Sequence, residues 1–430
     1  MNQTTHPSEF LLKKIAKLSK RRSPSNSWRV RSIEDTLESA IPVLDAAGIT
    51  RVSDITALDR IGLPTHVSVR PDASIGSLCV NAGKGVSAQE SLASAIMEGI
   101  EFHFADQKNS RVVTRRQPFD VFCDELPEGF SFSLFCPDVQ AKVCPDVQAK
   151  ATKNQEVSLL DAFHFETGQR LSVPAELVFH PLTELGSSSF FGTSTNGLCS
   201  GNSFSEAVLH GTFEVMERDT QSFLSFRPSV DAINEDALPD YIKDLLGAVR
   251  AAGFDVYLLY SPGDWGVHYV QAYIVAESTD PFRATFGSGA HVDPSIAVSR
   301  AVTEAAQSRL VHIHGGRDDL VDRHDFFTEK GSDYEKERVT DLLARLRNAN
   351  SCIDFTSLSQ PPLADIENTL SLLNKRIVET GLPGIFCVKL YESENIHVVR
   401  VLIPGMEAYS PRQRRIGPRL LSFIKELPQW

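Results

Sequence analysis

Six side chains that can offer oxygen ligands occur in three pairs along the chain. In each pair the two residues are three positions apart: Glu98/Glu101, Glu214/Glu217 and Glu304/Gln307. Residues with this spacing lie on the same face of a helix, where like charges repel each other. One pair alone is typical of a solvent-facing stripe. However, apolar residues such as Ile96, Met97 and Ile100 surround the first pair, and helices so apolar around their circumference are buried on most sides.

Carboxylates on mostly buried helices need partners, because an unpaired buried charge is costly. Hard cations are suitable partners, and Mg²⁺ in particular binds oxygen ligands and keeps positions for water and substrate phosphates. Five carboxylates and one amide oxygen from three helices suit two or more Mg²⁺ ions that hold a polyphosphate. The spacing therefore predicts a magnesium and nucleotide site rather than a set of solvated faces.

Each of the three helices is preceded by glycine and small residues. The stretches read GKGVSAQES, SGNSFSEA and GSGAHVDPS. Ser87 and Ser203 are each followed three residues later by a glutamate, which is the pattern of a capping box. In the third stretch Asp293 precedes Pro294, an N-cap followed by proline at the first helical position. We therefore expect the same helix start three times.

Residues near these helix starts are suited to bind a nucleotide. Lys84 lies between two glycines, where helix N–H groups favour anions. Ser194 and Asn196 form a small polar loop before the second helix, and Arg70 and Arg218 can bind phosphate in forked geometry, although a structural ion pair explains either arginine equally well. Neither GxxxxGK[ST] nor GxGxxG after a strand is present, so the site is predicted to be neither P-loop nor Rossmann.

Helical and strand patterns alternate along the whole chain, which indicates a mixed α/β (α+β) fold. Strands are expected in RVVTRR, EVSLLDAFHF, FDVYLLYS, VHYVQAYIVAE, GIFCVKLY and IHVVRVLIP. Helices are expected over Ile33–Ala47, Ala88–Ala105, Ser205–Leu224, Asp240–Ala252, Pro294–His312 and Tyr334–Arg347. We expect one catalytic domain over residues 28–430.

Two segments are predicted to lie outside the catalytic core. Residues 1–27 are basic and then Ser-rich, which favours a flexible tail over an amphipathic targeting helix. Residues 136–150 contain CPDVQAK twice, and we interpret them as a duplicated surface loop, since loops tolerate insertions. A metal site formed by Cys136 and Cys144 is the alternative for that loop.

Composition excludes several classes of protein. The 430 residues carry a net charge of -12, which argues against a general nucleic-acid binder. No stretch approaches the roughly 20 apolar residues of a membrane span, and no secretory signal is visible. The seven cysteines are scattered and form no CxxC pair, which favours a reducing, cytoplasmic location. The histidines His103, His210 and His291 lack HExxH-type spacing, so a structural role is preferred over a generic metalloenzyme.

With the three segments side by side, the chain resembles the YcaO family. That family shows a GKG loop before an ExxE helix, an SNG-type loop before a helix ending in ExxER, and a third helix with ExxQ. The corresponding stretches here are GKGVSAQESLASAIMEGIE, STNGLCSGNSFSEAVLHGTFEVMERD and AVTEAAQSR. GITRVSDITALDRIGLPTHVSVRP and EAAQSRLVHIHGGRDDL resemble the branch found with a TfuA-type partner, and VVRVLIPGMEAY resembles the C-terminal strand and PGxE turn of the family.

The resemblance implies a YcaO-type fold whose ATP site is built from three helices. It implies an enzyme that uses ATP and Mg²⁺ to activate a peptide backbone amide, giving an azoline or a thioamide. Carried onto this chain, the Mg²⁺ and phosphate ligands are Glu98, Glu101, Glu214, Glu217, Glu304 and Gln307. The nucleotide contacts carried over are Arg70, Lys84, Ser194, Asn196 and Arg218.

The chain also departs from the family pattern. It ends in KELPQW rather than the Pro-rich tail of many azoline-forming members, which leaves thioamidation open, and Phe102 and His103 stand where Arg or Tyr is common. We see no leader-binding domain before Trp28, so a separate leader-binding or TfuA-like protein is expected to capture the precursor peptide. A dehydrogenase partner is expected for azoles, and a homodimer is expected from the family. The alternative is an accessory protein that binds ATP and a partner without modifying peptides.

Overall fold

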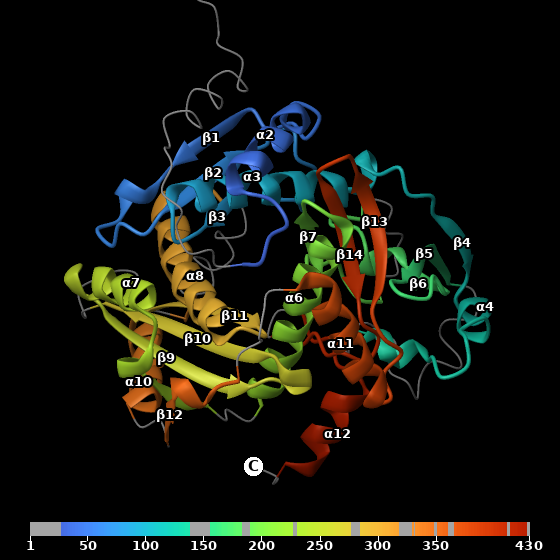
Figure 1. Ribbon diagram of the computed structural model, residues 1–430. Coiled ribbons are helices and arrows are strands. Elements are labelled where there is room, and N and C mark those ends of the chain that lie inside the picture. The colour runs from blue at the N-terminus through green and yellow to red at the C-terminus, as the bar shows by residue number, and fades with distance from the viewer. Residues whose placement is uncertain are drawn as a thin grey trace, which may run out of the picture. The chain divides into compact units, whose positions relative to one another are not determined.

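The computed structural model (Figure 1) describes residues 27–137, 155–182, 190–226, 230–276, 284–317, 329–330, 332–347, 351–359, 365–410 and 413–427. The basic tail and the duplicated CPDVQAK segment, apart from their edge residues Ser27, Cys136 and Pro137, lie outside these ranges. In the ranges described, helices and strands alternate, which confirms the mixed α/β prediction. No helix among these residues is long and apolar enough to cross a membrane.

The chain divides into two compact units. The first comprises described residues within Met1–Ala73, Leu78–Ile100 and Ser229–Leu363, and the second those within Ser74–Ser77, Glu101–Pro228 and Ala364–Trp430. The first helix that carries predicted ligands, α3 (Ala88–Ala105), passes from one unit to the other between Ile100 and Glu101.

The described part of the first unit contains two sheets whose strands are mainly antiparallel. In the smaller sheet the order is β1 (Arg51–Asp54), β2 (Thr65–Val69) and β3 (Val80–Lys84), with α2 (Ile33–Leu44) before it. In the larger sheet the order is β11 (Ala284–His291), β10 (His268–Val275), β9 (Asp255–Pro262), β8 (Asp231–Asn234) and β12 (Cys352–Asp354), in which only the pairing of β8 with β12 is parallel among the strands described.

Helices cover both faces of the larger sheet (Figure 1). On one face lie α7 (Asp240–Ala251) and α8 (Pro294–His314), and on the other lies α10 (Ser332–Arg347). The core between α7, α8 and the strands includes Leu246, Val270 and Ala301, which are fully buried. The C-terminal part of α8 also packs through Leu310 against Val67 of β2. Helix α8 therefore joins the two sheets of this unit.

The second unit is built on one sheet with the strand order β4, β5, β13, β14 and β7, and β6 pairs with β5. The strands span Arg115–Pro118 (β4), Glu156–His164 (β5), Arg170–Pro174 (β6), Leu198–Gly201 (β7), Phe386–Glu392 (β13) and His397–Leu402 (β14). The helices span Phe119–Asp124 (α4), Phe204–Leu224 (α6), Ile366–Glu379 (α11) and Pro418–Glu426 (α12). Helix α6 packs closely on β14, since a Cβ placed at Gly211 would lie 2.6 Å from Val401 Cγ2.

The predicted helices agree closely with the structure. Helix α3 has the predicted bounds, and α6, α7 and α8 differ from them by one or two residues at an end. One strand prediction was displaced: RVVTRR covers Arg111–Arg116, whereas β4 begins at Arg115. Val113 in that run is 84% exposed, so the apolar pair that suggested a strand belongs to a surface segment.

Each of the three helices that carry predicted ligands closely follows a strand, as β3–α3, β7–α6 and β11–α8. In each case a glycine of the strand lies against the backbone of the helix. A Cβ at Gly83 would lie 2.0 Å from Ala95 N, one at Gly201 would lie 2.6 Å from Ala207 N, and one at Gly287 would lie 2.3 Å from Ala301 O. Only glycine permits such an approach. The glycines that open the three segments are therefore packing residues.

The helix caps are formed largely as predicted. Ser87 and Ser203 each accept a hydrogen bond from the backbone N–H three residues later, at 3.2 Å, and Asp293 Oδ1 accepts from Ser295 N at 2.8 Å. The carboxylates reach one residue further back than a capping box requires. Glu90 accepts from Val86 N at 2.8 Å, and Glu206 accepts from Asn202 N at 3.2 Å.

Candidate functional site

The predicted Mg²⁺ ligands are shielded from solvent. Glu217 is 5% exposed, and the other five side chains are partly buried, so none of the six lies open on the surface. This arrangement argues against a solvated stripe on each helix. Carboxylates in such positions need hydrogen bonds or counter-charges.

In the first unit, Lys84 and Glu304 form an ion pair between β3 and α8, and their side chains are 15% and 25% exposed. One turn further along α8, Gln307 donates a hydrogen bond to the carbonyl of Ala82, also on β3. Two predicted ligands on α8 therefore contact strand β3, which also carries the predicted phosphate-binding lysine. Glu98, on α3 of the same unit, is half-buried.

In the second unit, Glu101 is held by fixed donors. Its Oε1 accepts hydrogen bonds from Ser200 N at 2.8 Å and from Ser200 Oγ at 2.5 Å, so the end of β7 orients this carboxylate. Glu214 on α6 accepts from the Cys199 thiol at 3.5 Å. Burial raises the pKa of Glu214, the Arg218 guanidinium opposes that rise, and the negative charge of Glu217 adds to it.

The loop Ser194–Asn196 is held by the side chain of Arg400, which lies on β14 and is 0% exposed. Its Nη2 donates to Ser194 O at 2.9 Å and its Nη1 donates to Asn196 O at 2.8 Å. Burial lowers the pKa of Arg400 to about 10, although the charge of Glu214 opposes that fall. In the part of the chain that the structure describes, the buried Asn196 Oδ1 has no hydrogen-bond partner.

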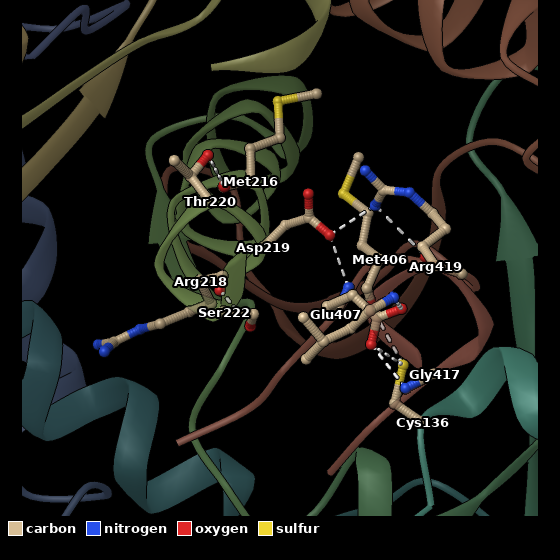
Figure 2. A network of polar contacts seen from close by, with 12 residues as sticks. Cys136, Met216, Arg218, Asp219, Thr220, Ser222, Met406, Glu407, Gly417 and Arg419 are labelled. Carbon is tan, nitrogen blue, oxygen red and sulfur yellow. Dashed lines mark hydrogen bonds and ion pairs between the residues drawn. The ribbon is translucent and has the colours of Figure 1, made fainter. Parts of the chain in front are cut away.

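The two predicted phosphate-binding arginines have different environments. Arg70 is 2% exposed and donates to Asn81 Oδ1 at 3.2 Å and to Leu78 O at 2.8 Å, so it ties the connection between β2 and β3. Arg218 is exposed on α6, and Figure 2 shows its side chain extending away from the neighbouring polar network. These bonds of Arg70 go to an amide and a main-chain carbonyl rather than to a carboxylate, and its role at the nucleotide stays a prediction.

A polar network anchors the C-terminal segment to α6 (Figure 2). Asp219 accepts hydrogen bonds from Glu407 N and from Arg419 Nη1, both at 2.6 Å. Glu407 in turn accepts from Gly417 N at 2.6 Å and lies 3.6 Å from the Cys136 thiol. Asp219 lies about 160° around the helix from Glu217, because successive residues turn by about 100°. Helix α6 thus presents ligand candidates on one side and anchors the chain on the other.

The cysteine and histidine residues of the alternative metal sites make other contacts where the structure describes them. Cys136 is buried and donates its thiol hydrogen to Met406 O at 3.1 Å, while Cys144 lies outside the described residues. His103 contacts the Asn109 side-chain amide at 3.3 Å, and His291 accepts from Asp293 N at 2.9 Å. Within the ranges described, no three His, Cys, Asp or Glu residues form a group that could hold a metal ion.

The donor types nevertheless fit Mg²⁺ and a nucleotide. Mg²⁺ usually binds through one or two carboxylates and completes its shell with water and phosphate oxygens, so a preformed cage of protein ligands is not required. The buried side-chain oxygen of Asn196, Oδ1, has no protein partner among the described residues, which makes it suited to contact a ligand. The residues present therefore fit the predicted cofactors.

Sequence reasoning missed two buried charges that shape the site. Besides Arg400, Glu176 is 6% exposed and accepts hydrogen bonds from the N–H groups of Phe190, Phe191 and Gly192, which begin the loop that leads to Ser194. Arg400 stands in the run VVRVLI, and a charge at the centre of an apolar strand is the signal that could have identified it. Glu176 lies in AELVF and shows a similar but weaker contrast.

Comparison with known proteins identifies the family of this chain. Residues 82–407 match the family model described as YcaO cyclodehydratase, ATP- and Mg²⁺-binding. That description confirms ATP and Mg²⁺ as the predicted cofactors. A protein of Methanothermobacter thermautotrophicus is 36% identical over 398 residues, which cover 91% of this chain and 98% of that protein.

Two further similarities bear on the branch and the fold. A protein encoded in the tfuA 3′ region of Rhizobium leguminosarum bv. trifolii is 29% identical over 412 residues, which cover 91% of each chain. The structure of YcaO from Methanopyrus kandleri, bound with AMPPCP and Mg²⁺, matches with a TM-score of 0.68 and 23% identity, covering 91% of this chain and 96% of that one. The latter similarity confirms the predicted fold.

Proposed function

This chain belongs to the YcaO family, and we propose that it is an ATP- and Mg²⁺-dependent enzyme that activates a backbone amide of a peptide. The observation that carries the proposal is the threefold strand–helix construction, in which every ligand candidate on the helices is at least partly buried. Stability alone gives no reason to bury so many carboxylates, since each burial costs free energy.

The residues are assigned complementary roles in this proposal. Glu98, Glu101, Glu214, Glu217, Glu304 and Gln307 hold Mg²⁺ and the phosphates of the nucleotide. Lys84, Ser194, Asn196, Arg218 and Arg70 contact the nucleotide. Glu101 is oriented by Ser200 before any ligand arrives, because its hydrogen bonds to that residue come from β7. Phosphoryl transfer depends mainly on such positioning and on neutralising charge.

Bound Mg²⁺·ATP would supply the phosphoryl group that makes the amide oxygen a leaving group. The product then depends on the nucleophile that adds to the amide carbon. A neighbouring Cys, Ser or Thr side chain gives an azoline, and a sulfide source gives a thioamide. The family description favours cyclodehydration, whereas the relative from the tfuA region favours a partner-dependent branch in which thioamidation stays open.

The substrate is proposed to be a precursor peptide that a separate leader-binding or TfuA-like protein delivers. The relative encoded in the tfuA 3′ region supports this assignment. A homodimer and, for azole products, a dehydrogenase partner complete the proposed assembly.

The test is an ATPase assay with Mg²⁺, with and without peptides that carry internal Cys, Ser and Thr, followed by mass spectrometry of the peptides. We expect peptide-stimulated turnover that requires Mg²⁺. Loss of one water from the peptide identifies an azoline, and replacement of oxygen by sulfur identifies a thioamide. Tight nucleotide binding without turnover, with any peptide or with a TfuA-like partner, would instead indicate an accessory protein.

A further inference from the structure

The Ser194–Asn196 loop is fixed to the second unit mainly through its backbone. Besides the two bonds from Arg400, Val401 N donates to Gly197 O at 2.8 Å, directly after the loop. Gln413 Nε2 donates to Thr193 O at 2.7 Å, directly before it. Gly197 has φ +77°, and a Cβ there would lie 2.3 Å from Val401 O. The loop therefore follows β14 at van der Waals distance.

Arg400 is an unusual residue for the place that it occupies. Its side chain is 0% exposed, and its neighbours Val399 and Val401 on β14 are also fully buried. A third donor, Nε, bonds to Val178 O at 2.9 Å, so all three hydrogen bonds of the guanidinium go to main-chain carbonyls. Among the described residues, no carboxylate lies within ion-pair distance of it. Burying a cation in this way is costly, and well-packed apolar residues in such positions are often at least as stabilising.

The charge of Arg400 is balanced at longer range by Glu214 and Glu101. Both are ligand candidates for Mg²⁺ in the proposed function. The guanidinium of Arg400 thus has two effects in the second unit. It donates hydrogen bonds to the carbonyls of Ser194 and Asn196, and it places positive charge near two of the candidate carboxylates. A planar guanidinium can satisfy two carbonyls at once in fixed geometry, whereas the ammonium of lysine cannot reproduce that fork.

We propose that Arg400 is a positioning residue for nucleotide binding, which fixes the backbone of the Ser194–Asn196 loop so that its side chains meet the nucleotide. The inference rests on the proposed function, because it assumes that this loop contacts the nucleotide. Arg400 acts through the loop and does not itself touch the ligand.

The test compares Arg400→Lys with the matched variant Arg415→Lys. Arg415 is also buried and also donates to two main-chain carbonyls, those of Phe135 and Cys136, which belong to a different segment. Affinity for Mg²⁺·AMPPCP is measured by titration calorimetry, which reports the affinity of the folded fraction. We expect Arg400→Lys to weaken binding about tenfold, as the loss of two hydrogen bonds predicts, and to raise the KM for ATP more than it lowers kcat. Arg415→Lys should lower Tm and leave the affinity unchanged.

A double-mutant cycle separates positioning from charge. If Arg400 acts through the loop, Asn196→Ala should weaken binding alone, and Arg400→Lys should add much less in the Asn196→Ala background than in the wild type. Wild-type affinity in Arg400→Lys would overturn the inference, since retention of charge would then suffice. Equal losses in Arg400→Lys and Arg415→Lys would overturn it as well, since the effect would be general destabilisation.

Gln413→Leu provides an independent variant in case Arg400→Lys does not fold. It removes only the bond to Thr193 O from a partly buried side chain, and we expect binding to weaken by about threefold. Unchanged affinity in this variant would contradict the importance of loop position. If Asn196→Ala and Ser194→Ala leave the affinity unchanged, the assignment of the loop in the proposed function fails. If those two variants weaken binding while Arg400→Lys does not, only the inference about Arg400 fails.

Discussion

The ligand candidates of the two units are satisfied in different ways. In the first unit, Glu304 takes its counter-charge from Lys84, which is itself a predicted nucleotide contact. In the second unit, Glu101 takes its hydrogen bonds from Ser200, whose N–H is part of β7. If the proposed function holds, the first arrangement exchanges partners when a nucleotide binds, whereas the second is oriented in advance. Preorganised groups lose less free energy on binding, so the second unit should set the geometry of the site.

The largest effect is expected from Glu214→Gln in the second unit. If Glu214 is a Mg²⁺ ligand, its loss should lower Mg²⁺-dependent ATP turnover on the order of a thousandfold, since metal stabilisation of charge is worth several kcal/mol. The stability of the variant should stay the same or rise, because burial and the charge of Glu217 already raise the pKa of Glu214 in the folded protein. Turnover and thermal unfolding are measured on the same preparation.

The control on the same helix is Glu206→Gln. Glu206 is 2% exposed and caps α6 by accepting a hydrogen bond from Asn202 N. Its replacement should lower stability by about 1 kcal/mol and leave turnover per folded molecule nearly unchanged. If both variants lose stability and activity in parallel, Glu214 has a structural role. The proposal that the second unit sets the geometry of the Mg²⁺ site would then be wrong.

The helices that carry the ligand candidates show how much could be predicted from sequence alone. The helix bounds and caps were predictable, because Ser87, Ser203 and Asp293 act on N–H groups within their own first turn. The ligand pairs at i, i+3 could be recognised as well, because their spacing lies within a single helix. Local patterns therefore specified where the ligand candidates lie along each helix.

The partners of the candidates could not be predicted, because they come from distant parts of the chain. Arg400 bonds to Val178, 222 residues earlier, and Lys84 pairs with Glu304, 220 residues later. Spacing along the sequence carries no information about such contacts. The partners of Arg70 are much nearer in sequence, since Leu78 and Asn81 follow it by 8 and 11 residues, but no helix or turn pattern relates them to it.

We expect the surroundings of the Ser194–Asn196 loop to lose stability at low pH. His180 Nδ1 lies 3.1 Å from Thr193 Oγ1, beside the Ser194–Asn196 loop. Burial lowers the pKa of His180 to about 4, and the nearby Arg400 lowers it further while Asp106 opposes the shift. An unfolded histidine has a pKa near 6.5. The contribution of neutral His180 to stability is therefore complete above about pH 6.5 and is lost as the pH falls towards 4.

The expected loss is about 2 kcal/mol after allowance for partial exposure of the ring. His180→Gln cannot be protonated, so the difference in Tm between this variant and the wild type should shift in favour of the variant as the pH falls from 7 to 4. Differential scanning calorimetry at several pH values measures this shift. A constant difference across the range would show that His180 titrates normally and does not control the loop.

The smallest effect is expected for the exchangeable pair of the first unit. In the free protein, Lys84→Met and Glu304→Gln should each destabilise, and together they should destabilise by less than their sum. For a partly buried ion pair, the coupling should be about 1 kcal/mol. With Mg²⁺ and AMPPCP at saturation, that coupling should shrink, because in the proposed complex Lys84 contacts phosphate and Glu304 contacts Mg²⁺. Coupling that is equal in both states would mean that the pair persists in the complex, and the first unit would then be as fixed as the second.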